Sequence, residues 1–330
     1  MTKAAPLLTL LLTLLLLAAC SSTPPAAPPP APASTPVPAP DPAFQALFPP
    51  NAPIEKLASG FQFIEGPVWL PGDRLLFSDI PANVVNQWSA ADNSVKEFLR
   101  PSENSNGLLA GPNNSLLLCQ HSGRRIAMRS ASGVITTLTD RFEGRKLNSP
   151  NDAVYHSDGS LYFTDPPYGL DKQDEDPGKE LAFNGVYRLA KGKLQLLSKD
   201  LSRPNGIAFS PDEKFLYVAN SDPARKLWMR YPVLPDGALG PGRVFADVTA
   251  EKADGLPDGL KVDEKGNLWA TGPGGVWVFS PEGKHLGTLQ PAEVPANLAF
   301  GGPDGKTLFL TARTGLYRIA TAVAGKKAVY

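Results

Sequence analysis

Six residues with side-chain oxygens occupy corresponding positions along the sequence, each at the start of a short apolar segment: Glu65, Asn106, Asn151, Asn205, Asp258 and Asn297. Taken singly, an Asn or Asp before Gly is typical of a turn. Recurrence in register is harder to explain by turns or packing, because a buried polar oxygen needs a partner. A cation held between these residues would supply that partner.

The mixture of oxygen donors indicates which cation would bind. Glu65 and Asp258 are carboxylates that would neutralise a divalent charge, and oxygen ligands suit calcium or magnesium better than zinc or copper. Asn carbonyls and waters tolerate the larger, irregular shell of calcium, whereas magnesium prefers a tighter octahedron. We therefore expect one divalent cation, Ca²⁺ in the first place, with Mg²⁺, Mn²⁺ and Zn²⁺ as alternatives.

A repeated structural element must position these residues. The repeat is a short strand, a turn rich in Pro, Asp, Gly, Lys and Asn, and a second apolar strand, found in residues 206–219, 259–270, 298–310, 67–77, 107–118 and 152–163. Its spacing of roughly 40–55 residues is typical of four-stranded propeller blades, and helical periodicity is absent. The sequence predicts an all-β fold, a six-bladed β-propeller, in which a strand near residues 54–63 completes the last blade. An irregular β-sandwich is the alternative.

Blade geometry then predicts which residues meet. The first strand of each blade lines the central channel and begins at one mouth, and the loop after the second strand returns to that mouth. We expect His121 in such a loop, whereas His156 would lie in a turn at the opposite mouth and His285 near a blade edge. Asp165 and Tyr168 occupy the equivalent loop of the third blade.

The first 50 residues differ in composition from the rest of the chain. Residues 1–20 combine Lys3, a leucine-rich apolar run and small residues before Cys20, which is typical of a lipoprotein signal peptide with Cys20 as the lipidated residue. Residues 21–50 are rich in Pro and Ala and predict a disordered tether, and residues 51–330 predict the folded domain. We therefore expect a monomer anchored to a bacterial membrane, on the periplasmic side of the cell envelope.

Charge and cysteine content exclude several classes of protein. The 32 Lys and Arg residues balance 32 Asp and Glu residues, and no basic block could follow a phosphate backbone, so no nucleic acid is expected as a partner. Once Cys20 is lipidated, Cys119 alone remains, which excludes an intramolecular disulfide and a thiolate metal cluster. Stability must come from a hydrophobic core, which a domain of this length can bury.

Four segments at the starts of repeats resemble the regucalcin/gluconolactonase family of six-bladed metal-dependent hydrolases: Glu65-Gly-Pro-Val-Trp69, Ser149-Pro-Asn-Asp152 with Tyr162-Phe-Thr-Asp-Pro-Pro-Tyr168, Arg203-Pro-Asn-Gly206 and Pro257-Asp-Gly259. The similarity extends over nearly all of the folded part. It implies a lactonase, typically acting on aldonolactones such as gluconolactone, with some relatives hydrolysing phosphotriesters. It also implies that Glu65, Asn205 and Asp258 hold the metal, with Asn151 close by.

The resemblance suggests roles for residues at the mouth. Bacterial gluconolactonase-like members tend to carry a His-x-x-Arg-Arg segment, which residues 121–125 match. We expect the cation to polarise a lactone carbonyl and Asp258 to act as general base or to position water, with His121 as the second choice. Expected substrate contacts are Asn106, His121, Arg124, Asp165, Tyr168 and Asn297.

Other functions are compatible with the same sequence. The site could act on phosphotriesters or other esters, because the metal-assisted step is similar and pocket shape selects the substrate. A non-catalytic propeller of the cell envelope would instead hold a structural calcium ion that solvent does not reach. A quinone-dependent sugar dehydrogenase would need more basic and His residues at the mouth than three histidines provide.

Overall fold

The computed structural model describes residue 1 and residues 41–330, where nearly all regular structure is β-strand. The predicted signal peptide after Met1, the lipidation site Cys20 and the tether up to residue 40 lie outside the described residues. Within the part that the structure describes, we find no helix with the length and apolar character that crossing a membrane requires.

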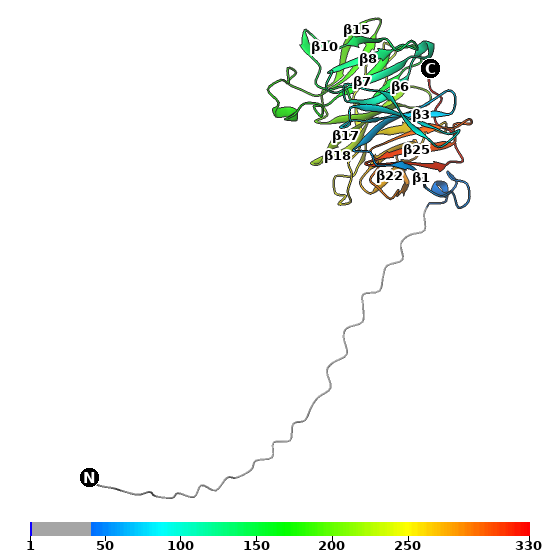
Figure 1. Ribbon diagram of the computed structural model, residues 1–330. Helices are drawn as coiled ribbons and strands as arrows, with labels where there is room; N and C mark the ends of the chain where they lie inside the picture. The colour runs from blue at the N-terminus through cyan, green and yellow to red at the C-terminus, as the bar shows by residue number, and fades with distance from the viewer. Residues whose placement is uncertain (2–40) are drawn as a thin grey trace, which may run out of the picture. The chain divides into compact units, whose positions relative to one another are not determined.

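The strands of residues 41–330 form six four-stranded antiparallel sheets, the blades (Figure 1). Blade 1 contains β2 (Ile64–Leu70), β3 (Arg74–Asp79), β4 (Val84–Ser89) and β5 (Val95–Leu99), and blade 2 contains β6 (Ser105–Ala110), β7 (Leu116–Gln120), β8 (Arg125–Arg129) and β9 (Ile135–Thr139). Blade 3 contains β12 (Ala153–Tyr155), β13 (Leu161–Asp165), β14 (Gly185–Ala190) and β15 (Lys193–Ser198). Blade 4 contains β16 (Pro204–Phe209), β17 (Phe215–Asp222), β18 (Arg225–Pro232) and β19 (Arg243–Asp247).

The remaining two blades complete the fold. Blade 5 contains β20 (Leu260–Val262), β21 (Leu268–Gly272), β22 (Gly275–Phe279) and β23 (His285–Leu289). Blade 6 combines β24 (Asn297–Gly301), β25 (Thr307–Ala312) and β26 (Gly315–Ala320) with the early strand β1 (Glu55–Ser59), which pairs with β26. This pairing confirms the predicted closing strand. Smaller elements are the hairpin of β10 (Arg141–Phe142) and β11 (Arg145–Lys146) and the 3₁₀ turns η1 (Pro112–Asn114) and η2 (Gln173–Glu175).

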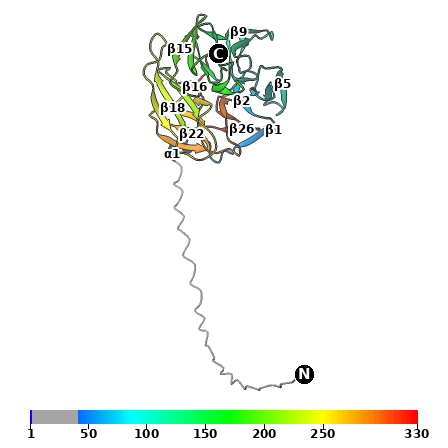
Figure 2. The same cartoon turned by 90° about the vertical axis from the view of Figure 1, so that its left-hand side faces the viewer.

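The blades surround a central axis (Figure 2). The first strands of neighbouring blades contact one another in a closed series, β2 with β6, β6 with β12, β12 with β16, β16 with β20, β20 with β24, and β24 with β2. The six-bladed β-propeller that the repeat predicts is therefore confirmed. Tight turns connect the strands, and residues that tolerate a left-handed backbone occupy many of them, such as Asp73, Asn83 and Asn93 with φ of 52°, 58° and 54°.

Each gap between neighbouring blades is filled by its own hydrophobic cluster. Successive residues of a strand point to opposite faces, so in β13 the side chains of Leu161 and Phe163 pack toward blade 2 while Tyr162 packs toward blade 4. Burial of both faces explains the nearly continuous apolar segments of the sequence. Buried pairs are Leu76 and Leu118 (blades 1 and 2), Leu117 and Phe163 (2 and 3), Tyr162 and Val218 (3 and 4), Trp228 and Leu268 (4 and 5), Trp269 and Leu310 (5 and 6), and Phe309 and Phe77 (6 and 1).

The folded unit begins earlier than the sequence predicts. Helix α1 (Pro42–Gln45) is capped by Asp41, whose carboxylate accepts a hydrogen bond from Ala43 N at 2.8 Å. Leu47 is buried in the cluster between blades 5 and 6, and Phe44 packs against the same cluster. Residues 41–50 therefore belong to the propeller, and the predicted boundary between tether and domain at residue 50 is too late because these apolar side chains find a blade surface to cover.

Candidate functional site

The six oxygen-bearing residues stand at or just before the first strands of the six blades, and we call them the axial ring: Glu65, Asn106, Asn151, Asn205, Asp258 and Asn297. All except Asp258 are at most 4% exposed. Asp258 keeps part of its surface exposed, although its Oδ1 is buried. The structure thus brings to the channel, at one end of the inner strands, residues that lie far apart in the sequence.

Close approach between blades requires glycine after several ring residues. Gly66, which follows Glu65, has φ of 54°, and a Cβ on it would lie 2.0 Å from the main-chain oxygen of Asn106 in the next blade. A Cβ on Gly206 would lie 2.3 Å from the main-chain oxygen of Asp258. These glycines therefore allow the main chains of neighbouring ring segments to come into contact.

Hydroxyl groups near the ends of second strands fasten four of the six ring segments to the preceding blade. Ser78 Oγ donates to Asn106 O at 2.8 Å, and Thr164 Oγ1 donates to Asn205 O at 2.7 Å. Thr271 Oγ1 donates to Ala296 O at 2.9 Å, beside Asn297, and Ser221 Oγ donates to Pro257 O, beside Asp258. Sequence reasoning missed this set; a hydroxyl near the end of the second strand in four repeats is the signal that could have revealed it.

Two carboxylates of the axial ring interact directly. Glu65 and Asp258 lie close enough for their charges to act on each other, and the Asn297 side chain lies beside Glu65. Burial raises the pKa of Glu65 to about 7, and burial together with the negative charge of Glu65 raises the pKa of Asp258 well above its ordinary value. The two raised pKa values show that positive charge within the described residues does not fully compensate these neighbouring carboxylates.

Several buried oxygens of the ring have no hydrogen-bond partner among the described residues, which also indicates that positive charge is needed here. Asn106 Oδ1, Asn205 Oδ1 and Asp258 Oδ1 are buried and have no hydrogen-bond partner. Within the described residues no three His, Cys, Asp or Glu side chains gather as metal ligands, so amide oxygens would have to complete any ligand set. Carboxylate and amide oxygens are the donors that a hard divalent cation prefers. The ring residues therefore fit such a cation.

The loop between β7 and β8 carries His121, as the blade geometry predicts. His121 is 5% exposed, and its Nε2 has no hydrogen-bond partner. Burial lowers the pKa of His121 to about 4, so its imidazole is neutral at pH 7. A Cβ on Gly169 would lie 2.7 Å from the Cβ atoms of both His121 and Ser149, which shows that this loop packs closely against the loop after β13.

Two predicted substrate contacts are engaged with the main chain. The Asp165 carboxylate accepts hydrogen bonds from Asn148 N and Ser149 N, both at 2.8 Å. Arg124 donates through Nε to Leu147 O at 2.7 Å and through Nη1 to Gly178 O at 2.8 Å. These bonds hold the loops around the mouth, and the structure does not bring either side chain into the hydrogen bonds of the axial ring.

Tyr168 lies closer to the ring. Its hydroxyl donates to Ser221 O at 3.4 Å, and Ser221 Oγ accepts a hydrogen bond from Asn205 Nδ2 at 2.9 Å. Burial, and after it the negative charge of Asp258, raise the pKa of Tyr168. The Tyr168 side chain is therefore connected to two ring residues, which suits it to form a wall of the site.

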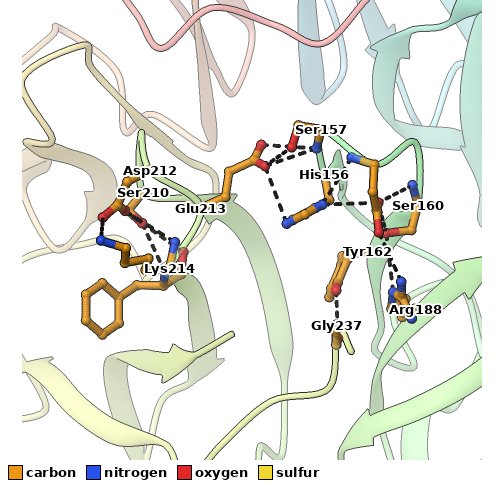
Figure 3. A network of polar contacts seen from close by, with 12 residues as sticks. His156, Ser157, Ser160, Tyr162, Arg188, Ser210, Asp212, Glu213, Lys214 and Gly237 are labelled. Atoms are coloured by element: carbon orange, nitrogen blue, oxygen red, sulfur yellow. Dashed lines mark hydrogen bonds and ion pairs between the residues drawn. The ribbon is translucent and has the colours of Figure 1, made fainter. Parts of the chain in front are cut away.

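The other two histidines lie elsewhere, in agreement with the sequence prediction. His156 stands in the turn between β12 and β13, where its Nε2 is 3.4 Å from Glu213 and Ser157 N donates to Glu213 at 3.1 Å (Figure 3). His285 begins β23, the outermost strand of blade 5, and stacks on Trp277 with ring centroids 4.3 Å apart.

Fold and ring together define a six-bladed β-propeller with an oxygen-lined site on its axis. The chain belongs to the SMP-30/gluconolactonase/LRE-like family, whose model matches residues 63–314. A gluconolactonase from Zymomonas mobilis subsp. mobilis is 39% identical over 308 residues, which cover 86% of this chain and 85% of the relative.

Solved structures agree with this assignment. A gluconolactonase from Xanthomonas campestris superimposes with a TM-score of 0.78 at 34% identity, covering 85% of this chain and 93% of that one. Regucalcin from Agrobacterium tumefaciens, a calcium-binding protein, gives a TM-score of 0.70 at 24% identity over 83% of this chain and 95% of its own. At that identity the likeness to regucalcin supports the fold alone.

Proposed function

We propose that this protein is a sugar-lactone hydrolase that uses a divalent cation bound by the axial ring. Lactone hydrolysis is supported by the gluconolactonase relatives, which match over most of their length. The observation that carries the site is the set of buried oxygens without partners on Asn205 and Asp258, beside the carboxylate of Glu65. Few arrangements other than a bound cation would offset this concentration of buried oxygen and negative charge.

Glu65, Asn205 and Asp258 would hold the cation, with Asn151 as the fourth residue at the same end of the channel. Calcium is the ion that we propose, because neutral amide oxygens suit its large and irregular shell. When bound, the cation supplies positive charge that polarises a carbonyl oxygen and stabilises the negative charge developing on it. This role needs no redox chemistry and no further cofactor.

Side chains of the mouth would orient the substrate and handle the proton. Asp258 is our candidate for positioning the attacking water or accepting its proton, since it combines a buried oxygen with partial exposure at the mouth. His121 is the second candidate, because its imidazole is neutral and its Nε2 has no hydrogen-bond partner in the described part of the protein. Asn106 would hydrogen-bond to substrate hydroxyls, and Tyr168 would line the sugar ring.

Metal analysis combined with lactone hydrolysis tests this proposal. We expect one divalent cation per chain and hydrolysis of gluconolactone that EDTA abolishes and added Ca²⁺ restores. Glu65→Gln and Asp258→Asn should each lose cation binding and activity, while Glu251→Gln, which changes an exposed carboxylate, should retain both. Full activity in either ring variant, or in protein shown to be free of metal, would contradict the site.

A substrate panel tests the chemical class. We expect gluconolactone to be hydrolysed faster than a hydrophobic lactone or a phosphotriester, because amide and carboxylate groups at the mouth favour a hydroxylated ring. A phosphotriester hydrolysed faster than every lactone would reassign the same site to the alternative reaction. Cation binding without hydrolysis of any of the three would favour a non-catalytic propeller.

We also propose that the chain is a monomeric lipoprotein of the cell envelope, anchored through Cys20. The support is the lipoprotein-like sequence before Cys20 and the Pro-rich segment that follows it. The full chain should partition into detergent and label with a fatty-acid probe, and a Cys20→Ser variant should do neither. Light scattering of the variant should give the mass of one chain; a dimer mass would refute the monomer.

A further inference from the structure

An ion pair crosses the channel next to the axial ring. Lys261 Nζ lies 3.7 Å from Asp152 Oδ2. Asp152 follows the ring residue Asn151 and precedes β12 in blade 3, whereas Lys261 is in β20 of blade 5. Blade 4 stands between these two blades in the ring, so the ion pair connects blades that are not neighbours.

Asp152 depends on this lysine for charge compensation. The residue is 3% exposed, and its Oδ1 accepts a hydrogen bond from Ala153 N at 2.8 Å. Its Oδ2 is buried and has no hydrogen-bond partner. A buried carboxylate without a full set of partners is costly, and the Lys261 ammonium is the positive charge that faces it.

Both members of the pair also act on the carboxylates of the ring. The pKa of Glu65 is raised mainly by burial, but the charge of Asp152 adds to this effect and the charge of Lys261 opposes it. The charge of Asp152 likewise disfavours ionisation of Asp258. Carboxylates from blades 1, 3 and 5 therefore repel one another in the same part of the channel.

Lys261 supplies the positive charge that a divalent cation alone would leave missing. Glu65, Asp152 and Asp258 carry three negative charges when ionised, of which a divalent cation neutralises two. Lys261 neutralises the third. Lys261 also lines a mostly apolar cavity of about 180 Å³, formed by residues further along the inner strands and by the C-terminal residues 326–330. The ammonium already occupies the position beside Asp152 that a second cation would have to take.

We propose that Lys261 is a fixed cation of the channel, which pairs with Asp152, completes the neutralisation of the ring carboxylates and limits the channel to one divalent cation. This inference rests on the proposed cation site. It assigns Lys261 and Asp152 as positioning residues, which act through the ring rather than on the substrate.

The test compares Lys261→Met, Lys261→Arg and the double variant Asp152→Asn/Lys261→Met with the wild type. Met keeps the length of the side chain without its charge, and Arg keeps the charge. Melting temperature in EDTA measures the cation-free protein, and calorimetric titration with CaCl₂ gives stoichiometry and affinity. In EDTA we expect Lys261→Met to melt several degrees lower, because the buried carboxylate of Asp152 then has no positive partner. Both other variants should melt close to the wild type.

With CaCl₂ we expect Lys261→Met to bind its first ion about tenfold more tightly, since a nearby positive charge is gone, and to bind a second ion weakly. The double variant should return to one ion and wild-type affinity. Unchanged melting in EDTA, unchanged binding by Lys261→Met, or no recovery in the double variant would overturn the inference. Absence of Ca²⁺ binding by the wild type would instead refute the proposed function, and the melting series would still decide the ion pair.

Discussion

Replacing Thr164 by Val tests whether hydroxyl groups hold the axial ring in place. The Thr164 side chain is fully buried, and its Oγ1 donates to Asn205 O at 2.7 Å across the boundary between blades 3 and 4. The same hydroxyl accepts a weaker hydrogen bond from Asp152 N at 3.3 Å. Val has nearly the same shape, so the substitution removes the hydrogen bonds and leaves the packing.

The cost follows from the buried groups that lose their partner. A net hydrogen bond contributes about 0.5–1.5 kcal/mol, and a buried group left unsatisfied costs about 1–3 kcal/mol. We therefore expect Thr164→Val to lower the free energy of unfolding by about 2 kcal/mol, which is a fall of about 3 °C in melting temperature for a domain of this size. Because Asn205 is a proposed ligand, calcium affinity should fall roughly tenfold, which corresponds to about 1.4 kcal/mol.

Urea unfolding, thermal melting and calcium titration measure these effects on one set of proteins. Thr164→Ser is the matched control: it keeps the hydroxyl and loses only a methyl group, so its calcium affinity should stay at the wild-type value while its stability falls slightly. If Thr164→Val melts at the same temperature as the wild type and binds calcium equally well, the hydroxyl does not position the ring.

Three further substitutions address the mouth and the blade contacts. Burial lowers the pKa of His121 to about 4, so the unfolded chain takes up a proton at this residue at a higher pH than the folded protein does. The free energy of unfolding should therefore fall by up to about 3 kcal/mol as the pH falls from about 6.5 toward 4. Unfolding of His121→Gln should lack this pH dependence. Gly169→Ala places a Cβ 2.7 Å from that of His121. The free energy of activation calculated from kcat/KM should change more than the free energy of unfolding measured by melting. Gly66→Ala meets Asn106 O at 2.0 Å and should lower stability by more than about 3 kcal/mol in urea unfolding.

The fold could be predicted from the sequence because its repeat is local. Each inner hairpin is encoded by apolar segments around a turn, so the period appears without knowledge of any contact between blades. The ring residues follow from the same register, since Asn205 and Asp258 take equivalent positions at the strand starts. The positions of His156 and His285 follow from the order of strands within a blade.

Other features depend on contacts between blades, which the sequence does not reveal. The bond from Thr164 to Asn205 joins different blades, and so does the pairing of Asp152 with Lys261. Asp165 illustrates the opposite error: its position at the end of β13 suggests a group facing the mouth, but its carboxylate turns to main-chain donors. Side-chain direction is decided by which unsatisfied donors lie within reach, and that is a property of the folded structure.

The location of the site follows from how the propeller distributes its stability. Hydrophobic clusters between neighbouring blades supply the apolar burial, and none of the six ring residues on the axis belongs to them. The inner strands can therefore carry polar residues at their starts, where carboxylates such as Glu65 would destabilise a continuous core. Repulsion at the axis is a local cost that the surrounding blades offset, and it is also what gives the axial ring affinity for a cation.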